Sequence, residues 1–456
     1  MKSRLAIRAG SLYIQAGKNS MDKRRVYLES YGCQMNEADS ELILGQLTST
    51  GFQIVPEAKE ADVILLNTCA VREHAEQRIY GRVAQLGKLK NRNPELLIGV
   101  CGCMATHLKE KIIQKSQWVD LVVGPDSYRR LPEIIEKAVD EPFVDVRLDK
   151  YENYTDIKPV RAEGVRAWIS IMRGCDKFCT FCIVPFVRGR EHCLPLDQVL
   201  EQVKEAADEG FQEVVLLGQT VNSYKDKEKG VNFADLLEQA SMVEGIKRIR
   251  FTSPHPLDFD QETLEVMREN PKICPQVHLP LQSASNAVLD KMKRRYTIEF
   301  YDELLQRFRE AIPEIAITTD IIVGFPGEEE KDYQQTYDYM AKTKFDSAFM
   351  FKYSPREGAK SYKWGDPVPE EEKIRRLEGI IKLQEGISLE KNQNEVGGIT
   401  EVLVEGEAKR EEGFWFGKNP QFKTVVLLKD GTKPGEFVRV RIKRGTPHTL
   451  IGEIVK

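Results

Sequence analysis

Strand-like and helix-like segments alternate through the first third of the chain, and this alternation limits the fold more than any other property of the sequence. Residues 24–30 (RRVYLES) and 61–67 (ADVILLN) have the apolar character of strands, and the second has the continuous run typical of buried parallel strands. Residues 37–50 and 72–89 have helical periodicity. Repeated strand–helix units predict a doubly wound parallel sheet.

Three cysteines lie at equivalent points of this pattern. Cys33, Cys69 and Cys103, which we call the first cysteine set, each follow a predicted strand, in the loop before the next helix. In a doubly wound sheet these loops gather at one edge, outside the carboxyl ends of the strands. Cysteines far apart in the sequence could therefore meet there.

The alternation resumes with a different rhythm after a polar linker at 145–160. Over 161–392, six strand candidates separated by helical segments predict a partial (β/α)6 TIM-like barrel, with its active site at the carboxyl ends of the strands. Over 393–456, short alternating strands punctuated by Gly, Pro and Asp predict a small antiparallel β-barrel, which we call the terminal barrel. The first domain then covers 23–144 and follows a flexible extension at 1–22.

The composition predicts a soluble, cytoplasmic protein. Of 456 residues, 41% are hydrophobic and 30% are charged, and the net charge of −4 predicts no strong non-specific attraction of the whole chain to nucleic acid. No apolar run approaches the ~20 residues that span a bilayer. Nine cysteines without an export signal argue against a disulfide framework and favour metal ligands.

The terminal barrel differs from the rest of the chain in its charge. Residues 414–456 contain nine Lys or Arg and three Asp or Glu, a local charge of +6, with Phe414, Trp415, Phe416 and Phe422 among them. This mixture can stack bases and follow phosphates, although the aromatic residues could equally form the core of the barrel. Arg188 and Arg190, in the segment VRGRE, could meet a carboxylate or a phosphate. The residues predicted to contact RNA are Arg188, Arg190, Phe414, Trp415, Phe416, Arg439, Arg441, Lys443 and Arg444.

The most specific pattern is the second cysteine set, Cys175, Cys179 and Cys182, in RGCDKFCTFCIVP after the first strand of the predicted TIM-like barrel. Three thiolates on a tight loop can bind three irons of a [4Fe–4S] cluster and leave the fourth iron open. An open iron can bind S-adenosylmethionine (SAM), so that one electron breaks the sulfonium bond and produces a 5′-deoxyadenosyl radical. The alternatives are a zinc site, which would usually add a fourth Cys or His, and ordinary core cysteines.

The second cysteine set resembles that of the radical SAM superfamily, in which an aromatic residue, here Phe181, precedes the third cysteine and lies against the SAM adenine. Spacing alone would make the first cysteine set structural. Its surroundings, however, resemble the N-terminal domain of the methylthiotransferases, in which three such cysteines bind an auxiliary [4Fe–4S] cluster. These surroundings read YGCQMNEADSE, NTCAVREHAEQ and GCMA. Further matches are VRGRE, LLGQTVNSY, RFTSPHP, HLPLQSASNAVLDKMKRRYT, TDIIVGFPGE and FKYSPREG, and the terminal barrel resembles a TRAM domain.

The motifs are most similar to the MiaB group of this family, which modifies isopentenyladenosine at position 37, next to the tRNA anticodon. The resemblance implies that the auxiliary cluster carries an extra sulfur that one SAM methylates, and that the cluster on the second cysteine set cleaves another SAM. The radical then takes hydrogen from carbon 2 of the adenine, and no separate protein acid or base is assigned. Both clusters must face one cavity, which we expect between the carboxyl ends of the two parallel sheets.

The resemblance also implies partners: the tRNA anticodon stem-loop, a reducing partner such as flavodoxin or ferredoxin, and a sulfur donor or cluster-assembly proteins. The nearest alternative is a methylthiotransferase acting on threonylcarbamoyladenosine in tRNA or on an aspartate of a ribosomal protein. A second is a non-enzymatic iron–sulfur carrier or tRNA-binding module. A third is a radical SAM enzyme with structural N-terminal cysteines, which predicts about four irons per chain instead of about eight.

Polar residues of the barrel motifs are candidate contacts to SAM or to the base, with loop capping as the alternative. The predicted SAM contacts are Phe181, Gln219, Asn222, Ser253, Gln282 and Asp320. His255 and His278 either line the cavity or have a structural role. Gly324 and Gly327 are expected to shape a turn. Cys101, Cys193 and Cys274 match no ligand position and are expected to be ordinary small residues, with Cys101 packed at a strand end.

Overall fold

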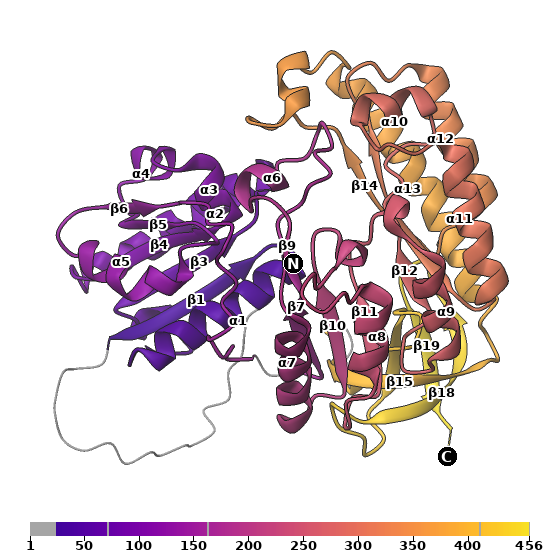
Figure 1. The fold of residues 1–456 in the computed structure, drawn as a ribbon, viewed down its shortest axis with the longest axis horizontal. Helices are drawn as coiled ribbons and strands as arrows, with labels where there is room; N and C mark the ends of the chain where they lie inside the picture. Colours follow the sequence, from indigo (N-terminus) through magenta and orange to yellow (C-terminus); the bar gives the residue numbers. More distant parts are fainter. Residues whose placement is uncertain (1–23, 71–72, 162–163, 410–411, 456) are drawn as a thin grey trace. The chain divides into compact units, whose positions relative to one another are not determined.

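The computed structural model describes residues 24–70, 73–161, 164–409 and 412–455, so the predicted extension at 1–22 lies outside the described residues. The chain forms two compact units (Figure 1). The first unit contains the N-terminal domain with 173–176 and 183–192, and the second contains 164–172, 177–182 and the chain from Cys193 onward. Among the described residues, no helix has the length and apolar character needed to cross a membrane.

The first unit is built on a six-stranded parallel sheet in the order β2-β1-β3-β4-β5-β6. Its strands are β1 (Arg25–Tyr31), β2 (Gln53–Ile54), β3 (Val63–Thr68), β4 (Leu97–Gly102), β5 (Leu121–Val123) and β6 (Phe143–Asp145). Its helices are α1 (Gln34–Ser49), α2 (Glu73–Gly87), α3 (Cys103–Leu108), α4 (Lys111–Lys115) and α5 (Leu131–Lys137), with short 3-10 helices at Ala58–Glu60, Lys88–Asn91 and Tyr128–Arg130. The predicted doubly wound parallel sheet is confirmed.

Both faces of this sheet are covered by helices, as Figure 1 shows. Val63 and Leu65 of β3 belong to the apolar cluster that includes α1 and α5, and Ile64 and Leu66 belong to the cluster that includes α2, α3 and α4. Successive residues of a strand point to opposite faces, so a strand covered on both sides is apolar throughout. This accounts for the continuous apolar residues 63–66 within the strand-like segment at 61–67.

The second unit contains two three-stranded parallel sheets in the orders β11-β10-β7 and β12-β13-β14. The strands are β7 (Arg166–Ser170), β10 (Glu213–Leu217), β11 (Arg248–Phe251), β12 (Gln276–His278), β13 (Ala316–Val323) and β14 (Ser347–Lys352). Between them lie α7 (Leu196–Asp208), α8 (Phe233–Ser241), α9 (Gln261–Glu269), α10 (Asn286–Met292), α11 (Ile298–Ala311) and α12 (Glu330–Thr343). A parallel bridge between Ile249 and Ile273 links β11 to the segment before β12. The predicted partial barrel of six strand–helix units is confirmed.

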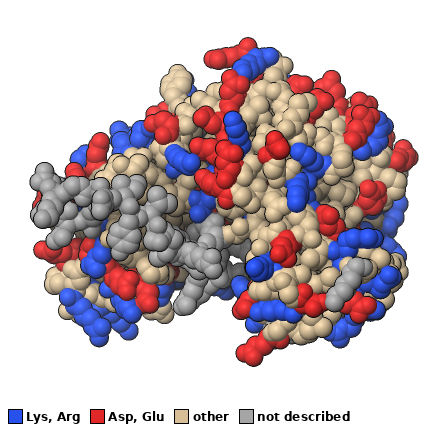
Figure 2. Space-filling view, turned by 90° about the horizontal axis from the view of Figure 1, so that it is seen from below, with Lys and Arg blue, Asp and Glu red and all other residues tan. Residues whose placement is uncertain are grey.

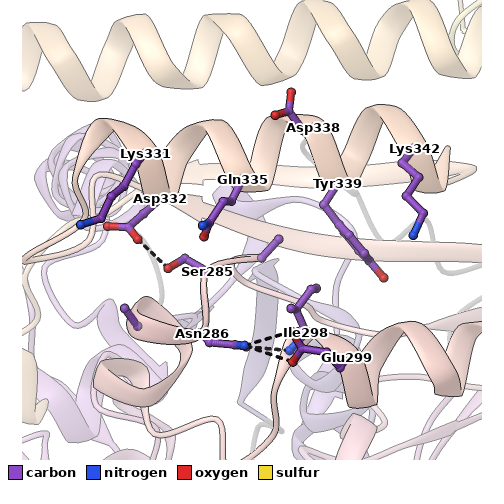
Figure 3. A pocket seen from close by; sticks show the side chains of 12 residues that line it. Ser285, Asn286, Ile298, Glu299, Lys331, Asp332, Gln335, Asp338, Tyr339 and Lys342 are labelled. Atoms are coloured by element: carbon purple, nitrogen blue, oxygen red, sulfur yellow. Dashed lines mark hydrogen bonds between the residues drawn. The ribbon is translucent and has the colours of Figure 1, made fainter.

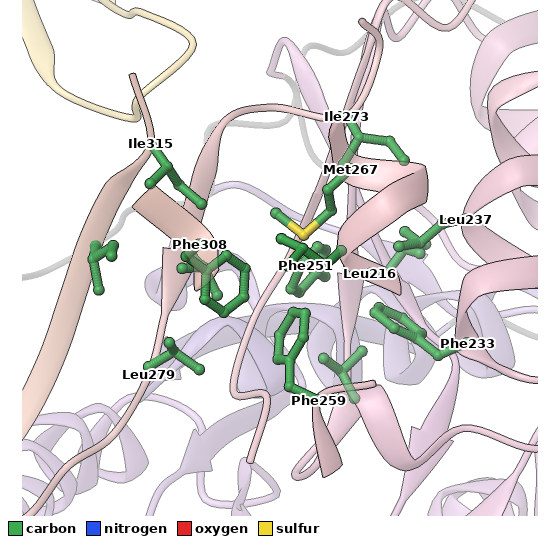
Figure 4. Packing of buried hydrophobic residues seen from close by; sticks show 14 of the residues in the cluster. Leu216, Phe233, Leu237, Phe251, Phe259, Met267, Ile273, Leu279, Phe308 and Ile315 are labelled. Carbon is green, nitrogen blue, oxygen red and sulfur yellow. The ribbon is translucent and has the colours of Figure 1, made fainter. Parts of the chain in front are cut away.

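A single apolar cluster extends through these six strands and their helices (Figure 4). The ring of Phe251 lies 5.2 Å, edge to face, from that of Phe233, and the ring of Phe259 lies 4.7 Å from that of Phe308. Such aromatic pairs add to the stabilisation that burial itself provides. The shared core therefore keeps the strands together although their hydrogen bonds form two separate sheets.

The second cysteine set lies in the segment between β7 and α7. This segment contains the short strands β8 (Met172–Arg173) and β9 (His192–Cys193) and the helix α6 (Val184–Val187). The remaining short helices of the second unit are 3-10 helices at Val221–Ser223, Pro256–Asp258 and Lys360–Trp364.

The long helix α13 (Glu370–Gln393) leads into the terminal barrel, which is closed in the order β15-β16-β17-β19-β18. Its strands are β15 (Ile399–Glu407), β16 (Phe414–Lys418), β17 (Thr424–Leu428), β18 (Phe437–Gly445) and β19 (Leu450–Ile454). The small barrel is confirmed, with one difference from the prediction. Strands β17 and β19 are parallel, because β19 enters between β17 and β18 to close the barrel.

The terminal barrel binds to the amino ends of the core strands through arginines. Arg166, Glu213 and Arg248 are the first residues of β7, β10 and β11. Arg248 and Arg250 donate to main-chain oxygens at the end of β16 and in the turn after it, over 2.7–2.9 Å. Arg166 bridges Glu213, whose side chain is 0% exposed, and Glu405 of β15. The cysteine loop, in contrast, follows the carboxyl end of β7.

Candidate functional site

The first cysteine set lies at the carboxyl ends of three neighbouring strands. Cys33 follows β1 and precedes α1, Cys69 follows β3, and Cys103 is the first residue of α3 after β4. Strands β1, β3 and β4 are adjacent in the sheet. The chain passes from β1 to β2 on one side of β1 and then to β3 on its other side, so the direction of strand addition changes between β1 and β3. Ligands of doubly wound sheets bind at such a switch point. The expected gathering of these loops at one edge is therefore observed.

Two glycines allow the loops of this edge to approach one another. A Cβ on Gly32 would lie 3.0 Å from the Cβ of Cys69, and a Cβ on Gly102 would lie 2.4 Å from Oδ1 of Asn67. Gly102 also has a φ of +91°, which side chains disfavour. A hydrogen bond with the Cys69 side chain and the charge of Arg188 lower the pKa of Cys33 to about 6. Its thiolate, the form that binds metals, is thus available near neutral pH.

Arg188 approaches the first cysteine set from the segment that follows the second. Its side chain is 3% exposed, its Nε donates to Sγ of Cys103 over 3.1 Å, and its Nη2 pairs with Asp39 over 2.6 Å. Its Nη1 is buried without a hydrogen-bond partner among the described residues. The carboxylate that the sequence analysis allowed as its partner is Asp39. Arg188 does not reach the surface, so the expectation that it contacts RNA is corrected.

A second buried arginine extends this ion-pair network. Arg173, 3% exposed, lies 3.5 Å from Asp39 and 3.5 Å from Asp126, and it donates to the main-chain oxygen of Pro125 over 3.0 Å. Helix α6, which begins two residues after Cys182, packs its Val187 on Cys103 and Ala70. The segments on either side of the cysteine loop are therefore anchored in the first unit.

The second cysteine set lies on the loop between β8 and α6. Cys175 and Cys179 are buried and Cys182 is half-buried. The main chain of Thr180 bonds to Met292 and Ser361 over 3.0 and 2.8 Å, which fixes the middle of this loop. Gly174 has a φ of +74°, and a Cβ there would lie 2.1 Å from the main-chain oxygen of Arg190. All nine cysteines are free of disulfide bonds.

Within the described ranges, no three His, Cys, Asp or Glu side chains are close enough to share one metal ion. Each cysteine set supplies three thiols, and thiolates are the ligands of iron–sulfur clusters.

Three of the predicted SAM contacts lie in unusual local environments. Oε1 of Gln219 is buried without a hydrogen-bond partner within the described part of the chain. Ser253 and Gln282 have φ values of +59° and +73° in the loops after β11 and β12. Left-handed backbone at residues other than glycine is frequent at ligand sites.

The other three predicted SAM contacts already have protein partners. Phe181 packs edge to face on Phe325, with ring centroids 6.5 Å apart. The amide of Asn222 bonds both main-chain groups of His255, over 2.8 and 3.0 Å, which is the loop-capping role. Asp320 lies 3.4 Å from Nε2 of His278.

The remaining cysteines and glycines behave as the sequence predicts. Cys101 is fully buried in β4, where burial raises its pKa to about 12, and Cys274 is 4% exposed. Cys193 is half-buried in β9. Gly324 and Gly327 have φ values of +72° and +86° and shape the turn after β13.

The residues predicted to contact RNA, apart from Arg188, lie at or near the surface. Arg190, Arg439, Lys443 and Arg444 are exposed. Arg441, Phe414, Trp415 and Phe416 are half-buried. Trp415 packs on the apolar core of the terminal barrel while Lys429 lies 4.2 Å above its ring. Figure 2 shows Lys and Arg interspersed with Asp and Glu on the face seen from below, so the basic residues do not form one uniform surface there.

A polar groove on the outer side of the second unit lies between α10, α11 and α12 (Figure 3). Ser285 donates to Asp332 over 2.6 Å, and the side chain of Asn286 donates to Glu299 and accepts from the main chain of Ile298. These side chains hold the helices together. None of the predicted site residues lines this groove.

Sequence reasoning did not single out Asp39, Arg173 or Arg294. Arg294, 5% exposed, donates to Sγ of Cys179 over 3.3 Å. The only signal was its position in the motif HLPLQSASNAVLDKMKRRYT, because an arginine is by default a surface residue.

Models of known families match this chain in three consecutive segments. Residues 25–124 match the "Uncharacterized protein family UPF0004", residues 169–340 match the "Radical SAM superfamily", and residues 393–455 match the "TRAM domain". The tRNA-2-methylthio-N(6)-dimethylallyladenosine synthase of Chloroherpeton thalassium is 45% identical over 432 residues, which are 94% of this chain and 96% of that protein. The synthase of the same name from Parabacteroides distasonis is 43% identical over 442 residues, 95% and 96% of the two chains.

Solved structures share the fold at much lower identity. The radical SAM methyltransferase TsrM of Kitasatospora setae, with cobalamin and a [4Fe–4S] cluster bound, has a TM-score of 0.54 and 14% identity, over 72% of this chain and 75% of that chain. The cobalamin-dependent radical SAM enzyme OxsB has a TM-score of 0.50 and 14% identity, over 79% and 56%. At this identity the comparison shows a common fold and nothing of the substrate.

Proposed function

Because this chain belongs to the MiaB-type methylthiotransferases of the radical SAM superfamily, we propose that it is a tRNA-2-methylthio-N(6)-dimethylallyladenosine synthase. Its substrate would be isopentenyladenosine at position 37 of tRNA, and carbon 2 of the adenine would receive the methylthio group. The observation that carries the proposal is the presence of two cysteine sets, each at the carboxyl end of parallel strands, in a chain whose relatives of that name match it over nearly its full length.

Two [4Fe–4S] clusters would be held by these sets, one by Cys33, Cys69 and Cys103 and one by Cys175, Cys179 and Cys182. When bound, the clusters and SAM would supply the sulfur, the methyl group and the radical that activates an inert C–H bond. Nη1 of Arg188, which is buried and has no hydrogen-bond partner among the residues that the structure describes, supports the first cluster, because a donor in this place can bond a sulfide. Six residues would contact SAM, with Phe181 against its adenine: Phe181, Gln219, Asn222, Ser253, Gln282 and Asp320.

For the methylthio group to reach the activated carbon, both clusters must face one cavity. Spin coupling between the two reduced clusters, measured by electron paramagnetic resonance, provides a test. Clusters that share a cavity will broaden each other's signals, and clusters on opposite faces will give two unperturbed signals.

The surroundings of the reaction follow from its chemistry. SAM cleavage requires one electron at low potential, for which flavodoxin or ferredoxin is the proposed donor. Each turnover consumes a sulfur, which a sulfur donor or the cluster-assembly proteins would replace.

We propose that the anticodon stem-loop contacts the exposed Arg190, Arg439, Lys443 and Arg444 and the aromatic residues of β16, in the cytoplasm. The domain limits 23–144, 145–160, 161–392 and 393–456 are part of the same proposal.

The decisive experiment uses anaerobically reconstituted protein with SAM, a reductant, and tRNA that carries or lacks the isopentenyl group. Mass spectrometry of the digested tRNA should show a methylthio increment on isopentenyladenosine alone. An increment on threonylcarbamoyladenosine or on a ribosomal protein aspartate would instead identify a different methylthiotransferase. No increment on any of these, with 5′-deoxyadenosine still formed, would refute the proposed substrate.

Alanine variants separate the two cysteine sets. Replacing all of Cys33, Cys69 and Cys103 should reduce the iron content from about eight to about four per chain. This variant should still form 5′-deoxyadenosine and should make no methylthio product. Replacing Cys175, Cys179 and Cys182 should abolish 5′-deoxyadenosine. Cys193→Ala is the matched control and should keep all irons. About four irons in the unmodified chain would contradict the two-cluster proposal.

A further inference from the structure

Arg294 is a buried cation beside the second cysteine set. It follows α10, between Lys293 and Arg295, which have φ values of +57° and +62°. This left-handed backbone on both sides lets two neighbouring residues stay exposed while the Arg294 side chain is 5% exposed. Three groups accept its hydrogen bonds: Sγ of Cys179 over 3.3 Å, the hydroxyl of Tyr296 over 3.0 Å, and the main-chain oxygen of Pro280 over 2.9 Å.

The surroundings of Arg294 differ from those of the other two buried arginines near the cysteine sets. Within the described residues, no Asp or Glu oxygen lies within 4.0 Å of its guanidinium, whereas the buried Arg188 and Arg173 both lie near Asp39. His255, also buried nearby, stays neutral, because burial and the charge of Arg294 lower its pKa to about 2. A buried cation without a counter-charge is strongly destabilising. Of the groups that accept hydrogen bonds from Arg294, only Sγ of Cys179 belongs to a residue that is proposed to bind the cluster.

We infer that Arg294 is a positioning residue for the cluster on the second cysteine set, that it bonds the Cys179 thiolate, and that it raises the reduction potential of that cluster. A [4Fe–4S] cluster with three thiolates becomes more negative by one charge when it takes one electron from an external low-potential donor. A fixed guanidinium stabilises the more negative state more strongly, and hydrogen bonds to cysteine sulfur act in the same direction. Arg294 thus makes the transfer of an electron to the cluster more favourable.

The inference rests on the proposed cluster, so its test uses a chain in which only that cluster forms. In the full chain with Cys33, Cys69 and Cys103 replaced by alanine, the midpoint potential is measured by redox titration of the electron paramagnetic resonance signal. Arg294→Gln should lower the ratio of reduced to oxidised cluster at a fixed potential at least tenfold, which is about 59 mV for one electron. Arg294→Lys, which keeps the charge but not the geometry, should lower it less.

Two controls separate the charge from local disturbance. Tyr296→Phe removes the hydroxyl that accepts from Arg294 but leaves the cation, and Arg295→Gln removes an exposed charge from the adjacent position. Each control variant should change the ratio of reduced to oxidised cluster by less than threefold. If Arg294→Gln also changes this ratio by less than threefold, the inference is overturned.

A measurement that keeps Arg294 covers the case in which Arg294→Gln fails to bind iron. The chain with Cys33, Cys69 and Cys103 replaced by alanine, labelled with ¹⁵N at arginine, should show a weak ¹⁵N coupling to the reduced cluster in pulsed electron paramagnetic resonance, and Arg294→Lys should lose it. An absent coupling would overturn the inference while leaving the proposed function intact. A chain that binds no iron at Cys175, Cys179 and Cys182 would refute both.

Discussion

Glu213 is the acid on which the attachment of the terminal barrel depends, so Glu213→Gln should loosen that attachment. Its carboxylate is 0% exposed and lies 2.9 Å from Nε of Arg166 and 3.2 Å from Nε of Arg250, whose side chain is 2% exposed. Removing one partner of a buried pair costs about 3–5 kcal/mol, because the remaining charge stays buried. At 1.36 kcal/mol per factor of ten, the fraction of molecules in which the terminal barrel is detached from the core strands should rise about a hundredfold to several thousandfold.

Cys274 provides a native reporter of this opening. The thiol is 4% exposed, and Arg250, Glu213, Arg248 and Arg166 are the charges that act on it. Its rate of alkylation, followed by peptide mass spectrometry, should therefore rise by the same factor in Glu213→Gln.

The matched control is Glu401→Gln, which removes an acid that is 54% exposed and 2.9 Å from Arg248. An exposed pair contributes about 0–1 kcal/mol, so the alkylation rate should change less than about fivefold. A change below fivefold in Glu213→Gln as well would refute the reasoning, since the buried pair would then contribute no more than the exposed one.

The effect of Glu213→Gln should not depend on pH near neutrality. Burial raises the pKa of Glu213, but the charges of Arg250 and Arg166 outweigh it and give a net decrease. A carboxyl whose folded pKa is lowered stabilises fully above its unfolded value, and this contribution disappears as the pH falls through the folded pKa. The ratio of alkylation rates between the variant and the unmodified chain should therefore be constant from pH 6 to pH 8.

Three further predictions concern the site. Arg188→Met should reduce the iron content toward about four per chain while 5′-deoxyadenosine formation persists, and an unchanged iron content would contradict the assigned contact. Burial and nearby cations lower the pKa of His255 to about 2, so the unfolded chain binds a proton that the folded chain does not, and stability should fall as the pH drops below about 6.5. His255→Asn should make the urea midpoints at pH 5 and pH 7.5 more similar, and equal differences in both proteins would count against this account. Gly174→Ala, whose Cβ would lie 2.1 Å from the oxygen of Arg190, should abolish 5′-deoxyadenosine formation, whereas Gly81→Ala, with open space around it, should not.

Much of the fold follows from local sequence patterns. The run at 61–67 predicts a strand covered on both faces, and the structure pairs β3 with β1 and β4 between two apolar clusters. Cys33 and Cys69 follow strands, so the parallel topology alone brings their loops to one edge. The parallel pairing of β17 with β19 was not predictable, because alternation defines a strand but not its neighbour.

The charged residues of the site show where sequence reasoning fails. Arg188 and Arg294 are as polar as any surface arginine, and only their distant partners Asp39, Cys103 and Cys179 make their burial favourable. The amide of Asn222 holds the main chain of His255, 33 residues away, which is a further contact between distant parts of the chain. Such pairings depend on the tertiary fold, and no spacing along the chain predicts them.

Under the proposed contact of RNA with the terminal barrel, the attachment of this barrel to the amino ends of β7, β10 and β11 sets a minimum size for a fully bound substrate. A five-residue strand is about 16 Å long, and this length separates the barrel from the loop that carries Cys179 and Cys182. A free nucleoside can occupy only one end of that span, whereas a folded RNA can bind both. Shortening the RNA stem should therefore weaken its affinity long before it slows the turnover of RNA that is already bound.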